Sequence, residues 1–572
     1  MYDIIEKPVD FRYLKELPDS LKWEYFEPFF KDLESRDIND KESLVQFIKD
    51  WNEISVYLGE EVRWVYVQMS QDTENKDVRE KFSDYLTNIE PKLREISFEL
   101  EKKLLLSPAI KELDNGKYGI FIRNVKNQVE LYRKENLELQ KDLKLLEKEY
   151  GVISGKMTIE LDGKEVPLSA AQNKLKDPDR SIRKEVFEKV QGRRYQDKEE
   201  LNSLFNKLLN LRAEIAKNAG FDNFRDYKFK SMNRFDYSAK DCFEFHDSIE
   251  ALIVPLLKKN YEEKKAALKL DVFKPYDLDV NPDGSAPSVP FKSQDELVQK
   301  TVKCMSKVNP FFGKCLQKMS DRGHLDLEGR KGKAPGGFNM SLPKTGGAFI
   351  FMNASGSERD VRTMLHEAGH AVHSFLMDNQ QYDFQKSIPS EVAELASMSM
   401  ELFTFDYWDI FYNDEKSLKK AKKNQLESIL QILPWVATID SFQHWIYTNP
   451  GHTDEERSEY WLKCFNRFSP DIVDWTGYEN YKEVNWQKQL HLYQVPFYYI
   501  EYAMAQLGAV AMWKQYKTNP EEAINNYMNA LSLGNSRSIP ELYETAGIKF
   551  DFSKKYLEEL KDFLLDEISK LK

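Results

Sequence analysis

The sequence contains few of the residues that interrupt helices. Its 572 residues include 24 glycines and 22 prolines, which is below the usual share of these two residue types. Hydrophobic residues make up 41% of the chain and aromatic residues 13%. This composition predicts a mainly α-helical protein with a large core, and it excludes intrinsic disorder as the main state.

Cysteine is scarce as well, and no Cys-x-x-Cys spacing occurs among the four cysteines. We therefore do not expect a structural zinc site or a disulfide framework. Unpaired cysteines are typical of proteins from a reducing cytosol, so we expect a cytoplasmic protein. The four residues are Cys242, Cys304, Cys315 and Cys464.

Long apolar runs and a positive net charge are also missing. No apolar run reaches the length of about 18 residues that a membrane helix needs, so we expect no membrane partner. The start of the chain has no apolar segment typical of a signal peptide. The 83 basic and 95 acidic side chains give a net charge of −12. Because a phosphate-binding surface needs a positive field, we do not expect nucleic acid as a partner.

Three stretches depart from the helical periodicity that dominates the chain. Asp162-Gly163 between two short alternating runs predicts a β-hairpin near residues 157–167. Residues 270–295 are rich in Pro, Asp and Ser, and predict a surface loop. Residues 324–356 are rich in glycine, but they lack the Gly-Lys-Ser/Thr sequence of a phosphate-binding loop. They end in the apolar run 348–352, which predicts a strand.

The clearest motif is His366-Glu367-Ala368-Gly369-His370. Ser357 and Asp360 form a capping pair before it, and apolar residues then recur at helical steps, so we expect this motif within a helix. Residues four apart share a helix face, and both imidazoles can therefore bind one Zn²⁺ ion at about 2.0–2.1 Å. Glu367 projects beside them, where it could hold the zinc-bound water. The alternative is a helix with two surface histidines.

A catalytic zinc needs a third protein ligand and one open position. His373 lies on the same helix, where a third ligand cannot complete a tetrahedron, so we expect it beside the site or facing substrate. A second helix should begin near residues 387–390, with Pro389 in its first turn. Its glutamates share one face, which is either a ligand face or a solvated acidic surface. The spacing leaves open which acidic residue is the ligand, among Asp378, Asp383, Glu391, Glu394 and Glu401.

The motif and the second helix together resemble a known family. The motif, the following His373, and the stretch Val392-Ala393-Glu394-Leu395-Ala396-Ser397 are similar to the zinc peptidases of the oligoendopeptidase F and thimet oligopeptidase family. The resemblance covers roughly residues 200–560. It implies that Glu394 is the third zinc ligand and that Glu401 supports a histidine ligand. The metzincin pattern, with a further Gly and His after His370, is absent.

A second segment, HLYQVPFYYIEY at residues 491–502, strengthens the resemblance. By its residues alone, it is either an aromatic stripe of the core or a substrate-binding segment. In this family and in the related angiotensin-converting-enzyme family, a His and a Tyr pair near the C-terminus contact the substrate and the developing oxyanion. The resemblance places these roles on His491, Tyr499 and Tyr502, with Tyr498 as the alternative in register.

The resemblance also implies a fold, an activity and a mechanism. The fold would be mainly α, a two-lobed helical body with a deep central channel and a small β element beside the zinc site. We expect a catalytic domain at residues 201–572 after an N-terminal helical region at 1–200. The implied activity is that of a zinc-dependent endopeptidase, with one Zn²⁺ per chain, that hydrolyses internal bonds of short unfolded peptides. Glu367 would be the general base, and Tyr502, helped by His491, would stabilise the oxyanion.

Several alternatives remain open from the sequence. The strand 348–354, which includes Phe349 and Ala354, either binds the substrate backbone by β-addition or is purely structural. The chain could instead be a carboxydipeptidase of the angiotensin-converting type, or a non-catalytic peptide-binding protein with a structural metal. Because two histidines and a glutamate accept several ions, Mn²⁺ or Co²⁺ could replace zinc. The sequence does not indicate the oligomeric state.

Overall fold

The computed structural model describes residues 11–15, 17, 21–285 and 288–571. The chain forms two compact units that alternate along the sequence. Unit 1 consists of Met1–Glu130, Val289–Lys422 and Ala505–Phe550, and unit 2 consists of Leu131–Ser288, Lys423–Met504 and Asp551–Lys572. Each unit is thus made of three separate segments of the chain, whereas the sequence analysis predicted two continuous domains that meet near residue 200. That domain boundary stays a prediction.

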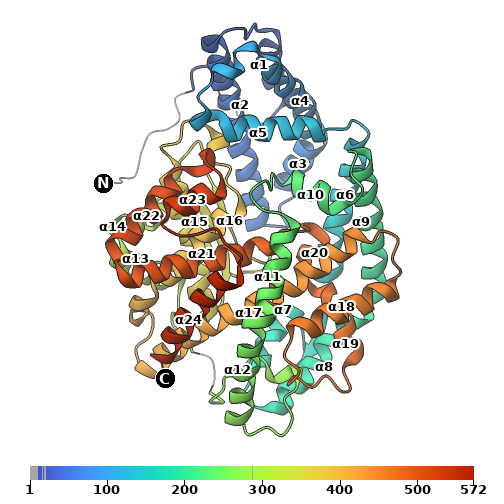
Figure 1. Cartoon of the computed structure of the whole chain (residues 1–572), viewed down its shortest axis with the longest axis vertical. Helices are drawn as coiled ribbons and strands as arrows, with labels where there is room; N and C mark the ends of the chain where they lie inside the picture. Colours follow the sequence, from blue (N-terminus) through green and yellow to red (C-terminus); the bar gives the residue numbers. More distant parts are fainter. Residues whose placement is uncertain (1–10, 16, 18–20, 286–287, 572) are drawn as a thin grey trace. The chain divides into compact units, whose positions relative to one another are not determined.

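Unit 1 is a set of helices around one small sheet, and in Figure 1 its helices α15, α16, α22 and α23 lie together. The elements of this unit are α1 Trp23–Ser35, α2 Lys41–Gln71, α3 Lys76–Asp84, α4 Glu90–Leu106, α5 Asn115–Leu131, α13 Gln294–Val308, α14 Pro310–Asp321, β3 Leu325–Glu328, β4 Phe338–Ser341, β5 Ala348–Ala354, α15 Glu358–Met377, α16 Ser390–Phe403, α22 Pro520–Ser532 and α23 Ile539–Thr545.

Unit 2 is helical apart from one hairpin, and α6 packs along α9 in it. The elements of this unit are α6 Asn136–Gly155, β1 Thr158–Leu161, β2 Lys164–Pro167, α7 Leu168–Gln172, α8 Arg180–Gln196, α9 Lys198–Asn218, α10 Phe224–Ser231, α11 Ala239–Leu252, α12 Val254–Ala267, α18 Asp454–Phe468, α19 Glu479–Glu483, α20 Leu490–Gln494 and α24 Lys554–Ser569. Two further helices, α17 Glu415–Thr448 and α21 Tyr499–Thr518, begin in one unit and end in the other, and α5 ends at Leu131, the first residue of unit 2.

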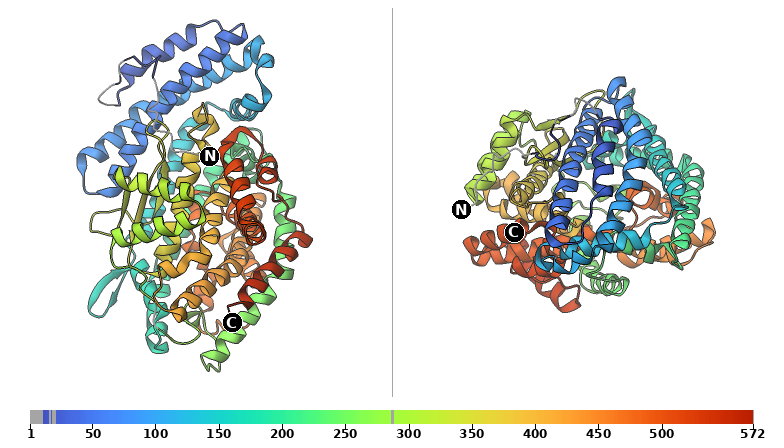
Figure 2. Two further views of the ribbon diagram at one scale, coloured as in Figure 1. Left: turned by 90° about the vertical axis from the view of Figure 1, so that its left-hand side faces the viewer. Right: turned by 90° about the horizontal axis from the view of Figure 1, so that it is seen from above.

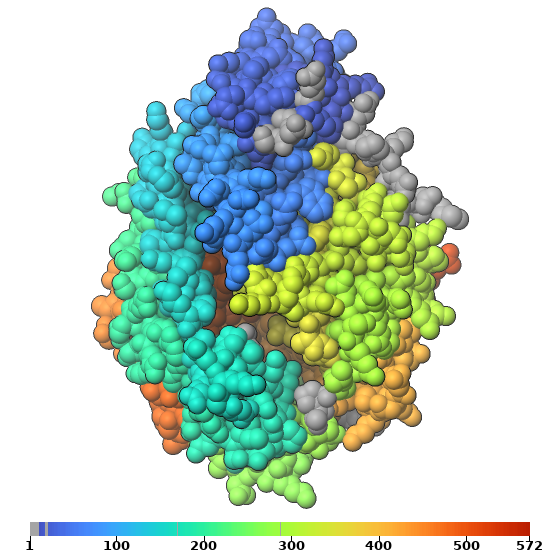
Figure 3. Space-filling view, turned by 180° about the vertical axis from the view of Figure 1, so that it is seen from behind, coloured from blue at the N-terminus to red at the C-terminus, as the bar shows by residue number. Residues whose placement is uncertain are grey.

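The small sheet of unit 1 has the strand order β3-β5-β4, so β5 is its central strand. β5 runs parallel to β3 and antiparallel to β4. Phe349 and Phe351, two residues apart on one face of β5, bury their rings together with Val67 of α2. At the surface, in Figure 3, the blue N-terminal segment lies against the yellow-green segment that includes the first strands of the sheet. The predicted β element is therefore confirmed, and it packs on α2.

The turn between β4 and β5 fixes the sheet to its neighbouring helices. The Glu60 carboxylate of α2 accepts hydrogen bonds from the backbone N–H groups of Lys344 (2.5 Å) and Thr345 (2.9 Å). Gly347 has a φ of +79°, and a Cβ there would lie 2.5 Å from the Phe375 ring of α15. A glycine is therefore required for the sheet to approach α15, the helix that carries the His-Glu-x-x-His motif.

The predicted hairpin of unit 2 is confirmed. β1 pairs with β2 in antiparallel register, with Leu161 opposite Lys164. Asp162 and Gly163 have φ angles of +52° and +72°, as the type I′ turn of a two-residue hairpin requires. The hairpin packs at the end of α8 and projects there in Figure 2.

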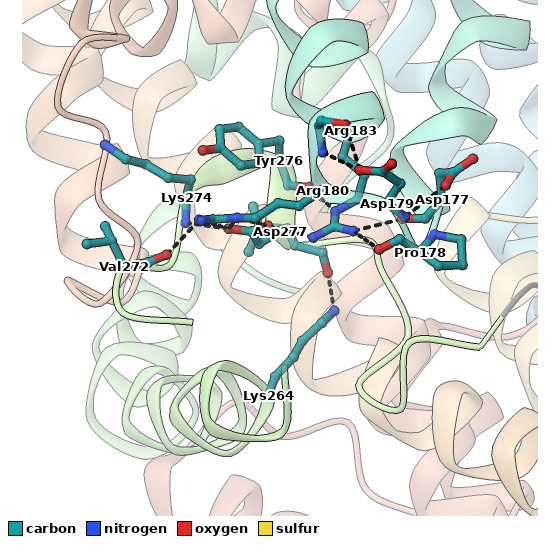
Figure 4. Close-up of polar contacts among 12 residues, drawn as sticks. Asp177, Pro178, Asp179, Arg180, Arg183, Lys264, Val272, Lys274, Tyr276 and Asp277 are labelled. Atoms are coloured by element: carbon teal, nitrogen blue, oxygen red, sulfur yellow. Dashed lines mark hydrogen bonds and ion pairs between the residues drawn. The ribbon is translucent and has the colours of Figure 1, made fainter. Parts of the chain in front are cut away.

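The prediction of a surface loop at residues 270–295 is wrong for residues 273–280, several of which are buried. Asp277 is fully buried, and its carboxylate pairs with Arg180 at 2.8 Å and with Arg183 at 2.9 Å (Figure 4). Phe273 and Val280 on either side are buried as well. The prediction rested on the polar composition of the segment. It failed because a charged side chain can lie inside a protein when it is paired, and the carboxylate has arginine partners on α8.

The mainly helical fold class is confirmed by these elements. Among the described residues, no helix has both the length and the apolar character needed to cross a membrane.

Candidate metal centre and catalytic residues

Helix α15 carries both histidines of the motif. It begins with a capping box, in which Ser357 and Asp360 bond each other's backbone N–H groups. His366 and His370 lie one turn apart, with ring centroids 4.9 Å apart, and both are half-buried. The predicted helix and capping pair are confirmed, and the two imidazoles share one face.

Helix α16 packs closely on α15 because the contact residues are small. A Cβ at Gly369 would lie 2.6 Å from the Cα of Ser397 and 2.9 Å from the carbonyl oxygen of Ala396. The helix begins at Ser390, directly after Pro389, close to the predicted start. This close approach is what brings a carboxylate of α16 to the histidines.

Glu394 is the carboxylate that α16 places beside both histidines. Its Oε2 lies 3.2 Å from Nε2 of His366 and 3.8 Å from Nε2 of His370. One ligand atom from each of the three residues lies within 4.8 Å of the others. Ser397 donates a hydrogen bond of 3.3 Å to Glu394 Oε2. Of the acidic residues left open by the spacing, Glu394 is the one that completes this group.

Glu401 holds the other side of His366. Its Oε1 lies 2.8 Å from Nδ1 of His366. A hydrogen bond at this nitrogen leaves Nε2 directed toward Glu394 and fixes the ring, as carboxylates commonly do for histidines that bind metal.

The charges of this group depend on one another. Burial lowers the pKa of His370 to about 4. Burial alone would raise the pKa of Glu394, but the hydrogen bond with His366 and the nearby His370 hold it at about 2. The two glutamates raise the pKa of His366 well above its ordinary value, despite the opposing effect of burial. The carboxylates beside His366 and His370 therefore favour positive charge at this point, as a bound divalent cation would supply it.

Glu367 lies next to this group and keeps one carboxylate oxygen, Oε2, without a hydrogen-bond partner among the described residues. Its side chain is 8% exposed. Burial raises the pKa of Glu367 to about 7. A buried, unpartnered carboxylate oxygen beside two imidazoles fits a bound water or substrate group. The two imidazoles and the carboxylate of Glu394 form the donor set of a catalytic Zn²⁺ site, and the unpartnered oxygen of Glu367 lies beside them.

Four of the predicted substrate-binding residues form a cluster in unit 2. The ring of His491 lies 4.8 Å from Tyr499, 5.9 Å from Tyr502 and 6.1 Å from Tyr498, between centroids. Its Nδ1 is 2.7 Å from the Gln489 side-chain amide. Tyr499 is buried, which raises its pKa to about 12, whereas the other three residues are half-buried. Tyr498 and Tyr502 are therefore better placed than Tyr499 to meet a ligand.

Comparison with known proteins identifies the family. Residues 174–562 match the peptidase family M3 domain, and residues 19–132 match the M3 N-terminal domain. This chain belongs to peptidase family M3. The suspected family is thereby confirmed.

Individual M3 relatives are distant in sequence and close in fold. The chromosomal oligoendopeptidase F of Lactococcus lactis subsp. cremoris is 25% identical over 329 residues, which are 56% of this chain and 52% of that protein. The structure of Pz peptidase A with an inhibitor has a TM-score of 0.90 at 24% identity, over 98% of this chain and 99% of that one. A Bacillus anthracis protein named as an oligoendopeptidase F has a TM-score of 0.85 at 25% identity, over 97% and 98% of the two chains. The chain thus aligns with about half the length of the first curated M3 relative.

Two expectations about the M3 substrate contacts need correction. β5 is hydrogen-bonded on both sides, so the strand 348–354 cannot add a substrate strand along its paired residues. Phe349 is 2% exposed and packs in the core, so its side chain cannot contact a peptide. Ala354, at the end of β5, is half-buried, and its role stays a prediction.

For His373, the substrate-facing alternative is wrong, whereas its expected position beside the site agrees with its interaction with His370. The ring of His373 is 1% exposed, on the part of α15 that packs against α22, and burial lowers its pKa to about 3. A ring enclosed in this way packs in the interior of unit 1, so we no longer assign it a contact with substrate.

The structure also reveals supporting residues that the sequence analysis missed. Asn339 of β4 donates a hydrogen bond of 3.1 Å to the carbonyl of Glu367. In unit 2, Arg234 donates to the carbonyl of Phe497 (2.8 Å) and pairs with Glu501 (2.5 Å). Gln443 accepts from the N–H of Phe497, whose φ is +66°. These contacts join residues far apart in sequence, so no local pattern could have pointed to them.

Proposed function

We propose that this M3 family member is a zinc-dependent endopeptidase that hydrolyses internal bonds of short, unfolded peptides. The observation that supports it most is the convergence of His366, His370 and Glu394 from two helices, with the free Oε2 of Glu367 beside them. The relatives named oligoendopeptidase F support the same activity.

His366, His370 and Glu394 would hold one Zn²⁺ ion, with Glu401 orienting His366. When bound, the ion supplies Lewis-acid stabilisation of negative charge and lowers the pKa of a water ligand to about 7. Glu367 takes the proton of the attacking water on its free Oε2 and passes it to the leaving nitrogen. The hydrogen bond from Asn339 to the Glu367 carbonyl holds this turn of α15 in place.

Tyr502 donates its phenolic O–H to the developing oxyanion, with His491 as its partner. Support comes from their shared cluster and from the half-buried state of both side chains. Donors of this kind typically contribute about 10²–10³ in turnover.

The peptide backbone binds along β4 rather than β5. β4 is an edge strand of the described sheet, all four of its residues are half-buried, and it contacts α15. An edge strand can pair with an extended peptide, which suits unfolded substrates of any sequence. The predicted channel, which would exclude folded proteins, remains part of this proposal.

A cytoplasmic location also remains a proposal. All four cysteines are unpaired and buried, as is usual for proteins in a reducing compartment.

The deciding experiment uses a peptide with a fluorophore and a quencher at opposite ends, with fragments identified by mass spectrometry. We expect cleavage at internal bonds, loss of activity with a chelator, and recovery on adding Zn²⁺. Release of C-terminal dipeptides alone would favour a carboxydipeptidase. A zinc-loaded chain that cuts no peptide would favour a binding protein with a structural metal.

A further inference from the structure

Unit 2 contains a second group of metal-ligating side chains, far from the motif in sequence. Cys242 and His246 lie four residues apart on α11, and Asp440 and His444 lie four residues apart on α17. Ligand atoms of Cys242, Asp440 and His444 all lie within 4.8 Å of one another. Two facing helices thus place a thiol, a carboxylate and an imidazole at one point.

The polar atoms of this group are deeply buried and poorly satisfied. Exposed fractions are 0% for Cys242 and Asp440, and 3% for His444. Oδ1 of Asp440 and both ring nitrogens of His444 have no hydrogen-bond partner in the part of the chain that the structure describes. Nε2 of His444 is 3.3 Å from Oδ2 of Asp440, within ion-pair distance but without hydrogen-bond geometry. Buried polar atoms without partners are rare and call for an explanation, and a bound ion is one.

His246 fixes the carboxylate in place. Its Nε2 lies 2.9 Å from Oδ2 of Asp440, and its own ring is 1% exposed. Since this contact occupies Oδ2, the second oxygen, Oδ1, stays available. A histidine bonded to a ligating carboxylate in this way orients it toward an ion.

Aromatic rings pack around the buried His444, although Phe243 at the edge of this group is 42% exposed. The rings of Phe243, Phe497 and Phe229 lie 4.8, 5.4 and 5.8 Å from the ring of His444. In such an apolar shell, charges are tolerated only when they are paired or bind a metal. A thiolate and a carboxylate together balance the two charges of a divalent ion, with neutral imidazole as the third donor.

We propose that Cys242, Asp440 and His444 bind a second Zn²⁺ ion, which stabilises unit 2 and takes no part in hydrolysis. Thiolate and imidazole ligands select zinc over Mg²⁺ and Ca²⁺, which require oxygen donors. The burial of every ligand closes the site to peptides, so the ion is structural. This proposal departs from our expectation, drawn from the lack of Cys-x-x-Cys spacing, that the chain has no structural zinc site.

The test is a Co²⁺ titration of the full-length metal-free chain, read by spectroscopy. Only a thiolate ligand produces a sulfur-to-cobalt charge-transfer band in the near ultraviolet, so the histidine and glutamate site of unit 1 cannot contribute to it. We expect two equivalents of Co²⁺ per chain, together with this band. The double variant His366→Ala/His370→Ala should bind one equivalent and keep the band at full intensity.

Variants of two buried cysteines of unit 2 complete the test. Cys242→Ala should lose the band and one equivalent of Co²⁺, whereas the matched control Cys464→Ala should keep both. His246→Asn should weaken the second ion's affinity by about 10–100-fold, since it removes a residue that orients a ligand.

Three outcomes would overturn the proposal. One is a chain that binds a single equivalent of Co²⁺ and shows no charge-transfer band. The group around Cys242 would then be a metal-free network in which a protonated histidine balances the charge of Asp440. The others are two equivalents without a band, and a band that survives Cys242→Ala. If Cys242→Ala does not fold, the two other variants decide: the band must persist in both His366→Ala/His370→Ala and Cys464→Ala, and its loss from either would contradict the proposal.

Discussion

The two candidate metal centres are built on the same plan but differ in access to solvent. Each uses two side chains four residues apart on one helix and at least one from a second helix. In unit 1, His366 and His370 are half-buried, and Glu367 stands beside them with a free oxygen. In unit 2, all three ligands are buried among aromatic rings.

The difference shows how burial separates a catalytic from a structural role for similar ligands. A catalytic ion needs an open position for water and substrate, whereas a structural ion is enclosed by the protein. The ligand types agree with this assignment, since two imidazoles and a carboxylate are common in zinc hydrolases, and a thiolate gives the tighter bond expected of a structural site.

The largest effect is expected from breaking the accessible centre. Glu394→Gln removes the only negatively charged ligand of the proposed zinc ion, which lies beside both histidines. Turnover should therefore fall by about 10³-fold or more. Peptide hydrolysis and metal content are measured on the same sample. The control is Glu391→Gln, the same change one turn earlier on α16, which should keep most of the turnover. Full activity in Glu394→Gln would show that another residue holds the ion.

Tyr502→Phe tests whether the aromatic cluster of unit 2 serves the chemistry of the accessible centre. Loss of its hydroxyl should lower kcat by about 10²–10³ and change KM much less, because the hydrogen bond forms mainly in the transition state. Steady-state kinetics on one quenched peptide measures both constants. An unchanged kcat would transfer the proposed role to Tyr498 or Tyr499, for which the corresponding Phe variants are the next comparison.

Glu401→Gln tests whether the zinc affinity of the unit 1 centre can be lowered without changing that of the unit 2 centre. Glu401 contacts His366 but not the ion, so its loss should weaken zinc binding by about 10–100-fold. Competition with a chelator of known affinity measures this change. The proposed unit 2 site, whose ligands belong to the other compact unit, serves as the internal control. Equal weakening of both ions would point to general unfolding.

The smallest expected effect concerns the spacing of the helices that form the accessible centre. Gly369→Ala places a Cβ 2.6 Å from the Cα of Ser397, so α15 and α16 must separate, and stability should fall by about 1–3 kcal/mol. Urea unfolding measures it. Gly59→Ala on α2 is the matched control, since nothing lies within 4 Å of its added Cβ, and it should be neutral or stabilising. Equal stability of both variants would contradict the packing argument.

Features defined by neighbouring residues could be predicted from the sequence. The capping pair at Ser357 and Asp360, the Asp162-Gly163 turn, and the face shared by His366 and His370 each depend on a few adjacent positions. The assignment of Glu394 required resemblance to a family, because spacing alone left several carboxylates open. Its place beside the histidines then agreed with that assignment.

Features that depend on distant pairing could not be predicted. The position of β5 inside the sheet follows from pairing with β4, a four-residue strand without a clear pattern. Asp277 is buried because Arg180 and Arg183, almost a hundred residues away, neutralise it. The group around Cys242 was missed because its three proposed ligands come from two helices about two hundred residues apart, one from α11 and two from α17.

The most direct test of the account is the metal content and turnover of Glu367→Gln, measured together. Glu367 is proposed to move protons and not to bind the ion, so the variant should keep its zinc while turnover falls by about 10²–10⁴. A zinc-loaded Glu367→Gln variant with the turnover of the native chain would contradict the central claim.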